Sequence, residues 1–287
     1  MGLLQTARQA KHLAFVADKR LRRALKKAKF DAATRVFRNV ETVRPFFYDP
    51  KRYRKTFLAS DAEGGGTTEF PRRVFAVWAG ENELTDNRKR NLELLRGSIG
   101  LPVVLVSPLN LGEWLVEGAP LHPAYEHLSM IHRSDYLRGY LMHHHGGGYV
   151  DIKKPLASWA PSFDAMAADT DAWVTSYSAQ HANWIGKLPG RMGRDILVRY
   201  RLSFGKSGFM MRSHTPLTAE WLAEMDQRLD RAQSVLAQHP GGIFGDDANY
   251  PLSWTDLLGR VLDPLTLKYL THVRLDDRMM LDFEDYR

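Results

Sequence analysis

The stretch His132-Arg-Ser-Asp-Tyr-Leu-Arg-Gly-Tyr-Leu-Met-His-His-His-Gly-Gly-Gly-Tyr-Val-Asp-Ile-Lys-Lys-Pro155 decides the fold of this chain. Its first part has the apolar spacing of a helix, and a run of three glycines follows. Gly146 can adopt the left-handed conformation that the position after a helix needs. The chain then enters a short apolar strand that ends at Asp151. Ligand sites of open α/β sheets lie beyond the carboxyl ends of strands, so Asp151 is a candidate ligand contact.

Two further charged residues of this stretch share one side of the predicted helix. Asp135 and Arg138 are three positions apart, so their side chains lie on the same face. Such a pair alone is more often a surface ion pair than a ligand clamp, and a glycine run alone is usually a turn. The combination of the pair, the glycines and Asp151 within one short window is more specific than any of its parts.

On both sides of this stretch, segments with the apolar pattern of strands alternate with segments that have the apolar spacing of helices. Alternating strands and helices predict an α/β fold with a mostly parallel sheet and helices on both faces. Thr215 or Thr218 is expected to cap the last helix. Strands are predicted at 73–78, 102–107, 148–152, 172–178 and 207–212. Helices are predicted at 83–98 and 218–238, and residues 124–145 are predicted to form one or two helices.

Positive charge is concentrated in the N-terminal fifth of the chain. Residues 1–58 contain 16 Lys/Arg against 4 Asp/Glu, a net charge of +12, while the remaining residues carry −5 and the whole chain +7. Residues 3–40 have helical apolar spacing with basic residues between. This pattern is either a solvated helix face or a helix that lies on anionic lipid. Because no nucleic-acid-binding motif accompanies it, we expect an anionic membrane surface as the partner and no nucleic acid.

Small polar residues and three consecutive glycines at 59–69 predict a flexible linker. We therefore expect a basic helical arm at 1–58, the linker at 59–69 and one α/β domain at 70–287. The chain has no cysteine, which excludes disulfides and thiolate metal sites and fits a reducing cytosol. No signal peptide and no apolar run of the ~18 residues that a transmembrane helix needs is evident. We expect a cytoplasmic protein, peripheral on the inner face of the plasma membrane.

The window from Ser134 to Lys153 resembles the signature S-D-x-x-R … G-G-x-Y-x-D-x-D of glycosyltransferase family 32 and the capsular polysaccharide synthesis glycosyltransferases. The large glucosylating bacterial toxins have the same signature. Phe75-Ala-Val-Trp78-Ala-Gly80 resembles the first strand of this family, and Tyr250-Pro-Leu-Ser-Trp-Thr255 resembles, more weakly, the loop that closes over the donor. The resemblance covers residues 72–260 and does not include the basic arm.

This resemblance implies a GT-A fold and a retaining transfer of a hexose from a nucleotide-diphospho-sugar. The donor would be a UDP-, GDP- or dTDP-hexose, and the acceptor a polysaccharide, an oligosaccharide or a lipid-linked glycan. Trp78 would border the nucleotide base, Asp135 and Arg138 would hold the sugar hydroxyls and the ribose, and Asp151 would be the first acid of the D-x-D pair. The donor-binding residues that the resemblance implies are Trp78, Ser134, Asp135, Arg138, Gly147, Gly148, Tyr149 and Trp254, with Asp151 and Lys153 as catalytic residues.

The chain departs from the family pattern at the second acid of the D-x-D pair, which is Lys153 here. In the family this acid binds Mn²⁺ or Mg²⁺, and a protonated lysine cannot. Three interpretations follow: Lys153 itself neutralises the diphosphate, a metal is held by Asp151 or elsewhere with Asp246 and Asp247 as candidates, or the site is inactive. The third interpretation supports a second function class, a non-catalytic sugar-nucleotide-binding or scaffold protein of a polysaccharide assembly complex.

Other residues give weaker signals. Trp184 either lines an acceptor groove or is buried, and Arg191 and Arg194 either contact a phosphate or an acidic acceptor or lie in a solvated loop. His143 to His145 are successive helical residues, whose side chains point apart, so a metal cluster is not expected there.

Overall fold

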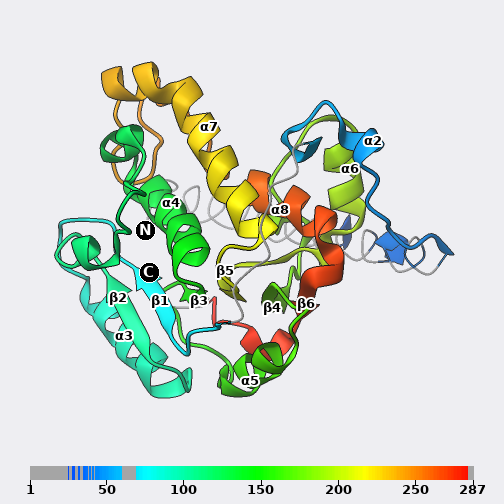
Figure 1. The fold of residues 1–287 in the computed structure, drawn as a ribbon, viewed down its shortest axis with the longest axis horizontal. Coiled ribbons are helices and arrows are strands. Elements are labelled where there is room, and N and C mark those ends of the chain that lie inside the picture. The colour runs from blue at the N-terminus through cyan, green and yellow to red at the C-terminus, as the bar shows by residue number, and fades with distance from the viewer. Residues whose placement is uncertain are drawn as a thin grey trace, which may run out of the picture.

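Six strands form one sheet that runs through the molecule, with helices on both sides (Figure 1). The structure is a computed structural model that describes residues 43–59 and 69–283, together with scattered positions from 25 to 41. The strands are β1 (Val74–Val77), β2 (Val103–Val106), β3 (Gly147–Val150), β4 (Val174–Ser178), β5 (Phe204–Met211) and β6 (Val273–Leu275). The α-helices are α2 (Pro50–Tyr53), α3 (Asp86–Ser98), α4 (Met130–His144), α5 (Ala160–Ala168), α6 (Gly190–Val198), α7 (Pro216–Gln238) and α8 (Gly259–Lys268). Short 3-10 helices, η1 to η7, lie at Phe57–Ala59, Leu111–Trp114, Pro123–His127, Ala182–Trp184, Tyr200–Leu202, Leu270–His272 and Asp277–Met279.

The strand order in the sheet is β2-β1-β3-β5-β4-β6. β1 pairs in parallel with both β2 and β3, and β4 pairs in parallel with β6. β5 is antiparallel to its two neighbours, β3 and β4. The sheet is therefore mixed and mostly parallel, which confirms the predicted α/β class with helices on both faces.

Alternation along the strands produces two apolar cores, one on each face of the sheet. In β1, Phe75 and Val77 belong to one core, while Val74 and Ala76 belong to the other. Successive side chains of a strand point to opposite faces, which explains the division. Helices α4, α7 and α8 supply the first core, and helices α3 and α5 supply the second.

Helix starts follow local capping chemistry. The Thr215 side chain caps α7, so of the two candidate residues it is the one used, and Pro216 is the first helical residue. The Thr85 side chain likewise accepts a hydrogen bond from Arg88 N, which places the start of α3 at Asp86. Of the two alternatives for residues 124–145, the structure has two helices, because Ser129 caps α4 after the separate 3-10 helix η3.

The end of α4 is the left-handed turn that the glycine run predicts. Gly146 has φ of 62°, and its N–H donates to the carbonyl of Leu141 at 3.1 Å. This bond satisfies a carbonyl of the last helical turn and reverses the chain into β3. α4 therefore runs antiparallel to β3, so that Asp135 and Arg138 lie near Asp151 at the far end of that strand.

The described part of the N-terminal region lies on the domain. Phe46, Tyr53 and Leu58 are buried and belong to the core that α4 and α7 supply. The described positions from 25 to 43 are helical. Residues 60–68 of the predicted linker and most of the arm lie outside the described residues, so the domain boundaries remain predictions. Among the residues that the structure describes, no helix combines the length and the apolar character needed to cross a bilayer.

Candidate functional site

Asp151 lies directly after β3, where the neighbouring strand β5 fixes its backbone. Its N–H donates to the carbonyl of Ser207 at 2.7 Å. Both carboxylate oxygens have partners, because the Tyr149 hydroxyl donates to Oδ1 at 2.9 Å and the Lys153 ammonium donates to Oδ2 at 2.6 Å. The carboxylate is thus held rigidly at the carboxyl edge of the sheet, which is where the sequence predicts a ligand contact.

Arg138 links α4 to this carboxylate. Its guanidinium lies 3.2 Å from Asp151 Oδ1 and 3.6 Å from Asp135 Oδ1, and it also donates to the carbonyl of Lys206 at 3.2 Å. The same guanidinium stacks on the Tyr149 ring, with 4.4 Å to the ring centroid. Ser134 forms a hydrogen bond with the Tyr149 hydroxyl.

The two carboxyls on either side of Arg138 have opposite electrostatic environments. Burial raises the pKa of the Asp135 carboxyl, and the Arg138 guanidinium offsets only part of that rise. Burial also acts to raise the pKa of Asp151, but Lys153 and Arg138 outweigh it and hold that pKa well below its ordinary value. A pair of carboxyls with divergent pKa values around one cation is typical of functional sites.

Lys153 lies beyond β3, in a turn in which its N–H donates to the carbonyl of Asp151 at 2.6 Å, and its ammonium is directed back to the Asp151 carboxylate. Besides Asp151 it contacts the Ser207 hydroxyl at 3.1 Å, and its ammonium lies 4.9 Å from the centroid of the Phe283 ring. Its side chain is 6% exposed, while that of Asp151 is 21% exposed. Asp151 is therefore the member of this ion pair that solvent, or a ligand, reaches more easily.

The residues around Asp151 do not suit a divalent ion at this carboxylate. Mn²⁺ and Mg²⁺ need several oxygen ligands, whereas the nearest charged groups here are an ammonium and a guanidinium. Asp246 and Asp247 lie in an exposed loop, and Asp247 Oδ2 accepts a hydrogen bond from the Gly242 N–H at 2.6 Å. Within the described ranges, no group of three or more His, Asp or Glu side chains is arranged to hold a metal.

Several residues that the resemblance implies have their own contacts outside the ion pairs of Asp151. Trp78 follows β1, and its indole N–H donates to the carbonyl of Asn82 at 2.7 Å. Trp254 is exposed. Gly147 and Gly148 lie at the opposite end of β3 from Asp151, and a Cβ on Gly147 would come within 2.8 Å of the Arg73 carbonyl oxygen. These two glycines permit close packing of β3 against β1.

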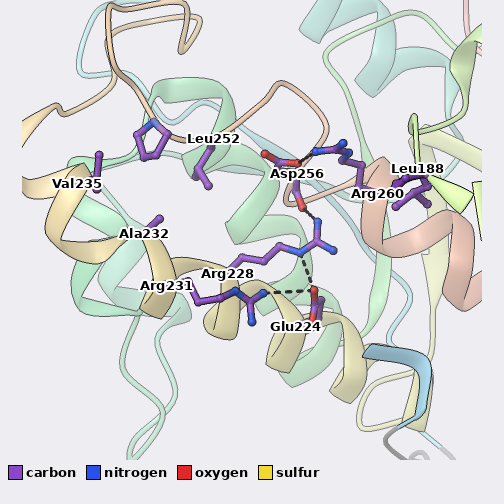
Figure 2. Close-up of a pocket in the computed structure, with 11 residues that line it drawn as sticks. Leu188, Glu224, Arg228, Arg231, Ala232, Val235, Leu252, Asp256 and Arg260 are labelled. Carbon is purple, nitrogen blue, oxygen red and sulfur yellow. Dashed lines mark hydrogen bonds and ion pairs between the residues drawn. The ribbon is translucent and has the colours of Figure 1, made fainter. Parts of the chain in front are cut away.

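The segment that contains Trp254 is attached to three helices, α4, α7 and α8. On one side, the His132 ring lies 2.9 Å from the Tyr250 hydroxyl and 3.1 Å from the Ser253 carbonyl oxygen, one helical turn before Asp135. On the other side, Asp256 pairs with Arg260 at 2.6 Å, and its carbonyl accepts from Arg228 of α7. Figure 2 shows this second attachment at a cavity of about 470 Å³. None of the predicted site residues lines that cavity, and the ion pairs and hydrogen bonds in its wall hold the loop in place.

Three residues near Asp151 could not be recognised from the sequence. Ser207 and Phe283 are distant in the chain and reach Lys153 only because the strands pair and the C-terminal segment returns to the sheet. Arg88, in the first turns of α3, donates to the carbonyl of Ile152 at 3.2 Å and adds a further cation beside the site. Trp184 contacts the Phe283 ring, with 5.1 Å between centroids, which extends an aromatic wall from Lys153.

The histidines at the end of α4 pack as a cluster of rings with His214. His143 lies 4.8 Å from both His144 and His214 between ring centroids. Burial, with the neighbouring rings, lowers the pKa of His143 and of His144 to about 4. These side chains are neutral at physiological pH and pack as aromatic rings against the start of α7.

Comparisons of the chain with protein-family models, with curated proteins and with solved structures found no match. The similarity to glycosyltransferase family 32 therefore depends on the signature residues themselves. Of these, Ser134, Asp135, Arg138, Tyr149 and Asp151 form one contiguous group of contacts. At the position of the second acid of the signature, this chain has Lys153, whose ammonium pairs with Asp151, the first acid.

Proposed function

We propose that this chain is a retaining glycosyltransferase of GT-A type that moves a hexose from a nucleotide-diphospho-sugar to a polysaccharide, oligosaccharide or lipid-linked acceptor in cell-surface glycan synthesis. The observation that carries the proposal is that Arg138 ion-pairs with both Asp135 and Asp151 at the carboxyl end of β3. Three signature residues from a helix and a strand end thus meet at the edge where α/β sheets bind ligands. A mixed α/β sheet with helices on both faces supports the GT-A assignment but is shared by many other proteins.

The charges of the site suit the proposed reaction. As the bond between the anomeric carbon and the diphosphate breaks, positive charge develops on the sugar and negative charge on the leaving group. Lys153, Arg138 and Arg88 supply cations for the diphosphate, and Asp151, with its lowered pKa, remains an anion for sugar or ribose hydroxyls. The acceptor oxygen forms the new bond on the face that the diphosphate leaves, and its proton passes to a phosphate oxygen. An α-linked donor then gives an α-linked product.

The aromatic wall beside Lys153 suits an acceptor. Sugar rings have apolar faces that stack on aromatic side chains, and Trp184 and Phe283 extend from the candidate site. We assign this wall to the acceptor side and Asp135, Arg138 and Asp151 to the donor side. Positioning of the two substrates would supply much of the rate enhancement, since the described site offers no separate nucleophile near Asp151.

Lys153 replaces the metal-binding acid in this proposal. A compact ammonium next to Asp151 neutralises phosphate charge that Mn²⁺ or Mg²⁺ neutralises in the resembling enzymes. The alternative is a divalent ion held by Asp246 or Asp247. A chelator would remove that ion and stop the reaction, whereas it would leave the charge of Lys153 in place. We also propose that the enzyme acts on the cytoplasmic face of the plasma membrane, to which residues 1–58 would bring it.

The second candidate function is a non-catalytic sugar-nucleotide-binding or scaffold protein. The close ion pair between Lys153 and Asp151, at 2.6 Å, favours it, because the pair satisfies the first acid without a metal. Both candidates bind a sugar nucleotide, but only the enzyme consumes it. Measuring the release of nucleoside diphosphate separates the two.

Binding itself is tested by a thermal-shift panel of UDP-, GDP- and dTDP-sugars, each with and without Mn²⁺. A ligand that binds the folded chain raises the melting temperature by mass action. We expect one nucleotide class to raise it, and the Asp151→Ala variant to lose that shift. A panel in which no sugar nucleotide changes the melting temperature would contradict both candidates.

A further inference from the structure

Two strongly exposed apolar side chains lie in the short segment before α2. Val43 is 84% exposed and Phe47 is 80% exposed, although Phe46 between them is buried in the core. Single exposed apolar residues are common on protein surfaces. Phe47 differs in that its neighbour Phe46 is buried in the core and fixes the backbone from which Phe47 projects into solvent. The segment is short, so both side chains remain close to that anchor.

The segment that carries them is held firmly against α6. The Tyr53 hydroxyl donates to Asp195 Oδ2 at 2.8 Å, and the Tyr48 ring stacks on Tyr53 at 5.6 Å between centroids. The Arg199 guanidinium lies over the Phe46 ring at 5.0 Å. These contacts fix the backbone from which Val43 and Phe47 project.

Cations surround this segment. Two cavities of about 420 and 450 Å³ share Arg44 and Arg52 as lining residues, and Val43 lines the first of them. Lys51 and Arg191 complete the basic lining of the second cavity, against one carboxylate, Asp49. The face therefore combines residues of the N-terminal segment with a residue of α6.

Most of this positive charge is not neutralised by the protein. Arg52 pairs with Asp195 at 2.9 Å, and Arg199 pairs with Glu41 and lies 3.7 Å from Asp195. Arg44, Lys51 and Arg191 form no ion pair with a residue that the structure describes. Three cations around adjoining cavities form a site for phosphate groups.

We propose that Val43, Arg44, Phe47, Lys51 and Arg191 form a docking face for an anionic lipid bilayer. The three cations bind headgroup phosphates, and the two apolar side chains enter the boundary between headgroups and acyl chains. A soluble phosphate or a nucleic acid would account for the cations but would leave Val43 and Phe47 in water. The inference extends the proposed membrane contact of residues 1–58 to the folded domain through Arg191, and it does not depend on the chain being a transferase.

The test is co-sedimentation of the full chain with phosphatidylcholine vesicles that contain or lack phosphatidylglycerol. Arg191→Glu is the decisive variant, because Arg191 lies outside residues 1–58 and its effect cannot come from the basic arm alone. Each cation near an anionic surface contributes ~1 kcal/mol, so reversing the charge should weaken binding about tenfold or more. Phe47→Ala should weaken it several-fold, because its ring no longer enters the bilayer.

The controls are Arg96→Glu for charge and Leu109→Ala for an exposed apolar side chain. Arg96 lies on α3 and Leu109 in the loop after β2, so both residues are exposed but belong to other elements than the proposed face. Both controls should bind vesicles as the wild type does, and all variants should keep the wild-type melting temperature. Wild-type binding by Arg191→Glu, or equal binding to vesicles without phosphatidylglycerol, would overturn the proposal. The proposal would also be overturned if inorganic phosphate released all of the protein from the vesicles at an ionic strength at which chloride released none, because the cations would then bind free phosphate.

Discussion

The guanidinium of Arg138 lies 3.2 Å from the carboxylate of Asp151, which joins the middle of helix α4 to the end of strand β3. Asp135, on the other side of the same guanidinium, is one helical turn earlier. A buried arginine between two carboxylates costs free energy of desolvation that only good pairing offsets. Removing one member therefore changes the charge that the other two experience.

Asp135→Ala and Arg138→Ala should each weaken binding of the donor, while the double variant should weaken it by less than the sum of the two free energies. The residues form one unit, so the second substitution removes interactions that the first has already disrupted. Titration calorimetry with the sugar nucleotide that the thermal panel identifies measures the cycle. Strict additivity, with unchanged melting temperatures, would show that the two side chains do not share a ligand.

Gly147→Ala should destabilise the fold by about 1 to 3 kcal/mol. Gly147 has φ of 85°, and an added Cβ would approach the Arg73 carbonyl oxygen to 2.8 Å. Gly97→Ala in α3 is the matched control, because open space surrounds it and alanine favours a helix by up to about 1 kcal/mol. Urea unfolding of both variants measures the difference. A Gly147→Ala protein as stable as the wild type would mean that this strand start is not held as described.

Stability should fall as the pH decreases from 6.5 to 4. The pKa of His143 and of His144 is lowered to about 4 in the folded chain, chiefly by burial, whereas the unfolded chain binds protons from pH 6.5 downwards. As the pH falls, the unfolded state therefore binds protons before the folded state does. The stability that the two neutral histidines contribute above pH 6.5 is lost as the pH falls to 4. The melting temperature of the double variant His143→Gln, His144→Gln should change less between pH 6.5 and pH 4 than that of the control His239→Gln. An equal change in the two proteins would refute the role of His143 and His144 in this pH dependence.

Much of the fold could be predicted from the sequence because its signals are local. The capped helices, the left-handed Gly146 and the alternating strands follow from residues within a few positions of one another. The direction of β5 could not be predicted, since nothing in its own residues determines whether its neighbours run parallel to it. Only the antiparallel pairing of β5 with β3 makes Gly208 the partner of Val150.

The candidate site divides in the same way. The contact of Asp135 and Arg138 with Asp151 follows from helical spacing and from a tight turn that sends the chain back along the helix. Ser207 and Phe283 reach Lys153 through long-range packing, so no short sequence pattern identifies them. The ion pair of Lys153 with Asp151 also depends on three-dimensional geometry, because β3 ends before both residues and the turn that follows it brings their side chains together.

Activity in excess EDTA tests the role of Lys153. A lysine that supplies the positive charge should leave substantial turnover without metal, and Lys153→Ala should reduce turnover because the diphosphate loses a cation. Lys153→Asp should make turnover more dependent on Mn²⁺, since it restores the second acid. Complete loss of wild-type activity in EDTA, restored by Mn²⁺, would instead assign the role to a metal held elsewhere, with Asp246 and Asp247 as the candidates.

The central claim is that Asp151, held between Arg138 and Lys153, forms the donor site of a sugar-transferring enzyme. The most direct measurement is the rate of nucleoside diphosphate release from the stabilising sugar nucleotide, for the wild type and for Asp151→Ala at equal concentration of folded protein. We predict steady release by the wild type and a loss of at least about a hundredfold in the variant, because a charged contact at the reacting substrate contributes a few kcal/mol. Equal rates for the two proteins, or no release by the wild type with any donor, would contradict the claim.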